Sequence, residues 1–129
     1  MPTWIELNPT NRFHCNTNGS ERLFVFGVQD WGLEVKDILA ALVITARSSV
    51  NARVRLKVED GASDDVNAFS SLGDAIAVIT VNAALLPVTL KGTLASNQLP
   101  YLRFTLAVTS TGATEEWVEV SGFAGGRPW

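Results

Sequence analysis

Apolar and charged residues alternate strictly over residues 52–59. The apolar positions are Ala52, Val54, Leu56 and Val58. Because successive side chains of a strand point to opposite faces, this alternation predicts a half-buried β-strand. Residues 101–109 repeat the pattern. Their predicted inward positions are Leu102, Phe104, Leu106 and Val108. The two segments are therefore expected to be core strands.

Weaker patterns predict additional strands. Residues 75–81, 88–94 and 117–121 are β-branched or alternating. Apolar residues upstream of residue 42 fall at helical spacing, but the following Leu-Val-Ile-Thr is strongly β-prone. We therefore predict a strand over residues 42–47, preceded by at most one short helical turn. This strand is expected to form a hairpin with residues 52–59. In residues 23–28, apolar side chains occur at both odd-numbered and even-numbered positions. We expect that segment to be buried on both faces, or to be covered by one of the chain's arms.

The number and spacing of these segments predict the fold class. Many short strands with polar turns favour an all-β protein, built as a single antiparallel β-sandwich of about seven to nine strands. The 129 residues fit one domain, and 47% hydrophobic residues can form a core without metal or disulfide. We predict one domain over residues 1–129, with an N-terminal arm at 1–12 and a C-terminal arm at 122–129.

Net charge and hydropathy limit which classes of partner and which locations of the protein we expect. The net charge of -3 leaves no broad cationic face, so we expect no nucleic-acid and no membrane partner. The longest apolar run, residues 38–44, is far shorter than the ~20 residues that cross a bilayer. The N-terminus lacks the basic start and apolar run of a signal peptide. The sequence thus predicts no signal peptide, no transmembrane segment and a virion or cytoplasmic location.

Residue types for catalysis are scarce. His14 is the only histidine and adjoins Cys15, the only cysteine, but neighbouring residues of an extended chain point to opposite sides. A single cysteine also excludes an internal disulfide and a zinc site of paired thiolates. We predict no enzyme, no catalytic residue and no cofactor. Whether Cys15 is buried is left open.

Two acidic clusters are candidate sites. The first consists of Glu59, Asp60, Asp64 and Asp65, whose oxygens suit calcium but whose spacing does not match a calcium-binding loop. A solvated turn is favoured and no metal is predicted, although calcium stays open. The second consists of Glu115, Glu116 and Glu119, which by number could form a glycosidase pair. Because Glu115 and Glu116 are neighbours at the start of a predicted strand, protection of an exposed strand edge is favoured for them.

Aromatic residues give the strongest hints of contacts. Trp4 and Trp129 lie near the two ends of the chain, where a large apolar ring implies docking on the domain itself or on a neighbouring subunit. Arg127 lies beside Trp129, and Arg and Trp recur as interface anchors. Trp4, Arg127 and Trp129 are therefore the predicted interface residues. As an alternative, Trp31, Tyr101 and Trp117 could stack on sugar rings.

One segment carries a family resemblance. Residues 99–106, Leu-Pro-Tyr-Leu-Arg-Phe-Thr-Leu, are followed by Thr-Ser-Thr-Gly at 109–112 and a final strand. This pattern resembles the closing strands of jelly-roll sandwiches, which occur in small accessory or decoration proteins of virions and in galactose-binding-like modules. The resemblance implies a jelly-roll fold. The acidic, histidine and arginine groups of a sugar-binding jelly roll have no counterpart here.

These observations lead to a functional hypothesis. The protein is predicted to be a non-enzymatic structural module that associates with copies of itself or with other subunits of an assembly such as a phage or virus-like particle. A carbohydrate-binding β-sandwich module is the alternative.

Overall fold

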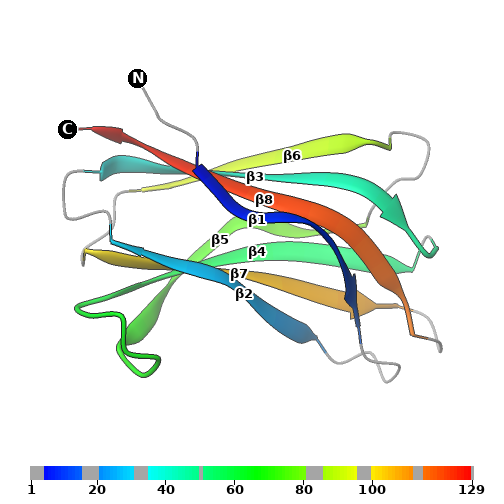
Figure 1. Cartoon of the computed structure of the whole chain (residues 1–129), viewed down its shortest axis with the longest axis horizontal. Helices are drawn as coiled ribbons and strands as arrows, with labels where there is room; N and C mark the ends of the chain where they lie inside the picture. Colours follow the sequence, from blue (N-terminus) through cyan, green and yellow to red (C-terminus); the bar gives the residue numbers. More distant parts are fainter. Residues whose placement is uncertain are drawn as a thin grey trace.

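The computed structural model contains two four-stranded antiparallel sheets that lie one above the other (Figure 1). It describes residues 5–15, 21–30, 35–49, 51–80, 86–95, 100–111 and 115–128. The strands are β1 (Ile5–His14), β2 (Arg22–Asp30), β3 (Val35–Arg47), β4 (Ala52–Gly61), β5 (Phe69–Thr80), β6 (Val88–Ala95), β7 (Tyr101–Ser110) and β8 (Trp117–Pro128). These residues form no helix, and hence none that is long and apolar enough to span a membrane.

The strand order is that of a jelly roll. The first sheet has the order β1-β8-β3-β6 and the second has the order β2-β7-β4-β5. Most connections therefore cross from one sheet to the other, as in the double Greek key of a jelly roll. The prediction of an all-β, antiparallel, jelly-roll-like sandwich of about seven to nine strands is confirmed for the described residues.

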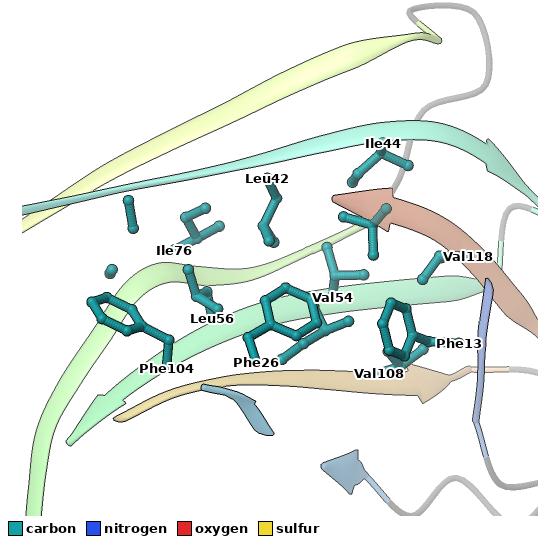
Figure 2. Packing of buried hydrophobic residues seen from close by; sticks show 14 of the residues in the cluster. Phe13, Phe26, Leu42, Ile44, Val54, Leu56, Ile76, Phe104, Val108 and Val118 are labelled. Carbon is teal, nitrogen blue, oxygen red and sulfur yellow. The ribbon is translucent and has the colours of Figure 1, made fainter. Parts of the chain in front are cut away.

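The core fills the space between the sheets. Figure 2 shows Leu42 and Ile44 of β3 facing Leu56 of β4 and Phe104 of β7. Every apolar position of the two alternating segments is buried, as predicted. Burying one such side chain contributes about 1.5–3 kcal/mol, so these strands fix which face of each sheet points inward.

Two glycines permit close approach between the sheets. A Cβ on Gly92 of β6 would lie 1.6 Å from the carbonyl oxygen of Ala75 in β5, so the backbones of these two edge strands nearly touch. A Cβ on Gly122 of β8 would lie 2.4 Å from the Phe26 ring. Only a residue without a side chain fits at either position.

The described parts of both predicted arms are strands of the first sheet, which corrects that prediction. β1 pairs with β8 from Ile5 opposite Ala124 to His14 opposite Trp117, and β8 also pairs with β3. Residues 5–12 and 122–128 are therefore paired in the sheet. Register shifts along β1, between Glu6 and Asn8 and again before Asn11, break the period-two pattern that would have revealed this strand.

The predicted hairpin between residues 42–47 and 52–59 is wrong. β3 begins at Val35, without a preceding turn of helix in the described residues, and it pairs with β6 and β8. β4 pairs with β5 and β7 in the other sheet. The turn at Ser48 and Ser49 therefore carries the chain from one sheet to the other.

Candidate functional site

Three large apolar side chains are exposed along β2, an edge strand of the second sheet. Leu23 is 50% exposed, Val25 is 58% exposed and Val28 is 36% exposed. We call these three residues the β2 stripe. The prediction that residues 23–28 are buried on both faces is wrong, because Phe26 is buried in the core and Phe24 packs against it, whereas the three stripe residues are exposed. The described arm residues do not cover the stripe, since they belong to the first sheet.

A β-bulge aligns the β2 stripe on one face. Val25 lies opposite Thr105, Gly27 opposite Phe104 and Val28 opposite Arg103, so β2 has one residue more than β7 in this stretch. Without it, Val25 and Val28 would point to opposite faces, because side chains alternate. Gly27 has a φ of 149°, a backbone conformation that favours glycine.

The other edge strands carry residues that discourage pairing with another chain. β1 contains Pro9 and Arg12, β5 contains Asp74, and β6 contains Lys91. Proline and charged residues are the usual means of protecting a sheet edge. Residues 23–28 contain neither. The charged residues of β2, Arg22 and Asp30, lie only at its two ends, so the middle of this edge strand is apolar.

Ion pairs lie beside the stripe on the outer face of the second sheet. Arg55 Nε donates to Glu21 Oε2 at 2.7 Å, and Arg55 Nη1 donates to Asp74 Oδ1 at 3.2 Å. The hydrogen bond to Glu21 raises the pKa of Arg55, and partial burial opposes this effect. Arg103 binds both carboxylate oxygens of Glu59, at 2.8 and 3.0 Å. Arg55 and Arg103 are thus both paired with carboxylates of the same chain.

Opposite charges mark the two ends of β2. Arg22 begins the strand and Asp30 ends it, and both side chains are exposed. The Arg22 guanidinium lies 5.1 Å from the centre of the Phe24 ring and donates to the His14 carbonyl at 3.5 Å. Arg22 lies opposite Val108, a core-facing position of β7, whereas Asp30 lies opposite Tyr101 on the outer face, so only Asp30 shares the face of the β2 stripe.

The predicted stacking residues do not form one platform. Trp117 begins β8 beside Ser48, whose N–H donates to its carbonyl at 2.9 Å. Tyr101 begins β7 in the other sheet, at the opposite end of the sandwich, about 30 Å away by the length of that ten-residue strand. The Arg12 guanidinium covers one face of Trp117, 3.9 Å from the ring centre. Trp31 lies outside the described residues.

The predicted interface anchors receive no test from the structure. Trp4 and Trp129 lie outside the described residues. Arg127 belongs to β8, but its side chain also lies outside the described part. The three residues stay a prediction, and the β2 stripe is the surface that sequence reasoning missed. The sequence feature that pointed to this surface is the run of apolar residues at odd and even positions of 23–28. The sequence alone favours burial or a covering arm, rather than exposure, as the explanation of that run.

The cysteine and the histidine do not form a catalytic pair. Cys15 is buried, and its Sγ donates to the Glu116 carbonyl at 3.2 Å. His14 instead lies at the surface, with Nδ1 2.9 Å from Glu115 Oε1. Neighbouring residues thus point to opposite sides, as the sequence predicts. A buried thiol bonded to backbone lacks the adjacent base that would activate it.

The carboxylates of β8 have a structural role. β8 lies between β1 and β3, so the prediction that Glu115 and Glu116 protect an exposed edge is wrong. Glu116 is buried and accepts hydrogen bonds from the hydroxyls of Ser48 and Ser49, the latter at 2.8 Å. This carboxylate joins the start of β8 to the turn after β3.

The acidic loop after β4 has the features of a turn. Glu59 binds Arg103, Asp60 is buried and Asp64 is exposed. Asp65 Oδ1 accepts a backbone N–H two residues further on at 2.9 Å, which is typical of an Asx turn. No cluster of three or more metal-ligating side chains occurs within the described ranges.

A shallow depression of about 300 Å³ lies between β3 and β6. It is lined by Leu39, Ala40, Lys91, Gly92 and Thr93. One ammonium group and one hydroxyl over a small apolar floor do not define a particular ligand.

Comparison with known proteins places the fold among jelly-roll β-sandwiches. No protein-family model matches the chain, and no curated protein matches its sequence. Among solved structures, VP2 in the subviral particle of infectious bursal disease virus matches with a TM-score of 0.68 and 8% identity, over 99% of this chain and 33% of that one. The protein in T=1 particles derived from the same virus matches with a TM-score of 0.65 and 8% identity, over 99% of this chain and 32% of that one. The chain thus spans about a third of the viral chains it matches.

A looser match is to the CBM36-1 domain of a multidomain xylanase from the hindgut metagenome of Trinervitermes trinervoides. It has a TM-score of 0.48 and 10% identity, over 100% of this chain and 99% of that domain.

Proposed function

We propose that this protein is a non-enzymatic structural module that assembles with copies of itself or with other subunits of a larger particle. The observation that carries the proposal is the β2 stripe, since contiguous exposed apolar side chains on a folded domain mark contact surfaces. The jelly-roll likeness to the viral-particle protein VP2 supports the same class of function.

The exposed area sets the strength expected of this contact. Each stripe residue is about half exposed, so covering it contributes about 1 kcal/mol, or about 3 kcal/mol for the stripe of one copy. A contact between two such stripes would gain about 6 kcal/mol. Association itself costs about 4–15 kcal/mol, so an isolated contact is weak. Such a contact suits an assembly in which each subunit makes several contacts at once.

The test is the mass of the protein in solution over a wide concentration range, with electron microscopy of the same samples. Sedimentation equilibrium should show species heavier than the 13.9 kDa chain as concentration rises. Images should show rings, shells or filaments, or binding to an existing particle. A monomer at the highest concentration, with no ordered particle and no binding to a host assembly, would refute the proposal.

The carbohydrate alternative has less support from the described residues. A sugar platform needs neighbouring exposed rings, whereas Tyr101 and Trp117 lie at opposite ends of the sandwich and Arg12 occupies one face of Trp117. A glycan array tests this alternative directly. Specific binding, lost on Trp117→Ala or Tyr101→Ala, would favour it over the assembly role.

A further inference from the structure

We propose that two copies of this chain associate through the outer faces of their first sheets, across a two-fold axis that runs parallel to the strands between β8 and β3. This inference rests on the proposed function and names the partner as a second copy of the chain. The evidence is the order of charge and size along one row of residues, together with the shallow depression beside that row.

One row of four residues crosses the outer face of the first sheet from edge to edge. The register places Glu6 of β1 opposite Phe123 of β8, and Phe123 opposite Ala41 of β3. Ala41 in turn lies opposite Lys91 of β6. Both neighbours of Ala41 along β3 are fully buried in the core, so Ala41 and the three residues in register with it point outward. We call these four residues the outer row.

The two ends of the outer row carry opposite charges. Glu6 and Lys91 are both exposed, and neither forms an ion pair with another described residue. Neighbouring strands are about 4.8 Å apart, so each residue lies about 7 Å from the line midway between β8 and β3. A two-fold axis along that line places Glu6 of each copy over Lys91 of the other, so the attractive pair forms twice. An axis at right angles to the strands would instead place like charges over each other.

The middle of the outer row is complementary in size under the same axis. Phe123 and Ala41 lie on either side of the axis, one strand apart. The Phe123 ring of each copy therefore packs over the small Ala41 side chain of the other. A large side chain meets a small one on both sides of the axis, which lets the two faces interdigitate at the separation of about 10 Å that is usual for packed sheets.

The shallow depression between β3 and β6 lies beside Ala41 and can receive the Phe123 ring of the other copy. It is lined by the outward-facing residues Leu39, Lys91 and Thr93, so it opens on the outer face. A cavity of about 150 Å³ is enough for a benzene ring, and the depression has about 300 Å³. The same face thus carries both a protruding ring and a place for it.

The dimer leaves the β2 stripe uncovered. Because both copies use the same face, the contact closes on itself and does not extend into a fibre. The β2 stripe belongs to the second sheet, on the other side of the sandwich. Each copy therefore keeps an apolar surface for contacts with other subunits, as an assembly with several contacts per subunit requires.

Matched charge reversals test the alignment. Glu6→Lys places two lysines over each other at both ends of the interface, and Lys91→Glu places two glutamates there. Each variant alone should dimerise about tenfold more weakly than the natural chain in sedimentation equilibrium at low salt. An equimolar mixture of the two variants restores opposite charges at both ends, and so does the double variant. Both should dimerise about as tightly as the natural chain.

Matched truncations test the ring. Phe123→Ala removes the side chain that packs on the other copy and should weaken the dimer at least tenfold. Val66→Ala truncates a valine that is 71% exposed in the loop between β4 and β5, and Val25→Ala truncates a residue of the β2 stripe. Neither control should change the dimer. Thermal melting followed by circular dichroism checks that every variant is folded, and the charge variants at exposed positions decide the outcome if Phe123→Ala does not fold.

The outcomes separate this inference from the proposed function. Oligomers that survive Phe123→Ala, or that are lost on Val25→Ala instead, would refute the first-sheet contact while an assembly role stands. Single charge variants that dimerise as tightly as the natural chain would refute the alignment. If the natural chain is monomeric but binds an existing particle, the dimer is refuted and the proposed function stands. If it is monomeric at every concentration and joins no particle, both proposals fail.

Discussion

Replacing Gly92 with alanine should force β6 away from β5, because the backbones of these strands are in close contact there. The added Cβ would lie 1.6 Å from the carbonyl oxygen of Ala75 and 2.6 Å from its carbonyl carbon. Reaching an ordinary van der Waals separation requires a movement of about 2 Å. The obstacle is backbone in a paired strand, so no side-chain rotation can relieve it. We expect a loss near the upper end of the usual range for overpacking, about 3 kcal/mol.

A second glycine provides a graded comparison. In Gly122→Ala the new Cβ meets the Phe26 ring at 2.4 Å, and a ring at the end of a side chain can shift. We expect a loss of about 1–2 kcal/mol for this variant. Thr93→Ala changes an exposed neighbour of Gly92 on the same strand and should cost less than about 0.5 kcal/mol.

Urea denaturation followed by tryptophan fluorescence measures all three variants. The free energy of unfolding should fall most for Gly92→Ala, with its melting temperature lower by roughly 10 °C. The slope of the free energy against urea should be unchanged, since the surface exposed on unfolding is the same. A Gly92→Ala free energy of unfolding within about 0.5 kcal/mol of that of the natural chain would refute the backbone contact. A Gly122→Ala protein less stable than the Gly92→Ala protein would also refute it.

Two other expectations concern the buried end of β8. Glu116→Ala removes the acceptor of two serine hydroxyls and should lower the free energy of unfolding by about 2–3 kcal/mol. Glu116→Gln keeps an acceptor oxygen and should lower it less. Equal losses for the two variants in urea denaturation would contradict this account. Cys15 is 2% exposed, so its thiol should react with a thiol reagent only after unfolding. Rapid labelling of the folded protein would show that the thiol is accessible.

The alternating strands β4 and β7 could be predicted in detail because every second residue of each strand faces the core, although Thr105 and Ala107 on the outer side of β7 are buried as well. Residues 52–59 and 101–109 show this directly. The strand β1 was missed because its register shifts remove the period of two. Strand pairing could not be predicted from local sequence patterns either. The partners of β3 lie more than forty residues further along the chain, whereas the local sequence favoured a hairpin with β4.

The candidate surface was visible in the sequence only as an anomaly. Residues 23–28 are apolar on both parities, and burial of both faces was the simplest explanation. The bulge at Gly27 changes that explanation, since Val25 and Val28 reach the same face only through the extra residue. Exposure depends on what packs over a strand. That property is set by the whole fold rather than by the strand's own residues.

The position of β8 has a consequence for how the protein is made. β8 follows every other strand in the chain, yet it lies inside its sheet, between β1 and β3. During synthesis the first sheet therefore lacks an inner strand until residues 117–128 have left the ribosome. Until then, β1 and β3 present unpaired edges to other nascent chains. Folding must wait for the end of the domain, and contacts of such long sequence separation form slowly.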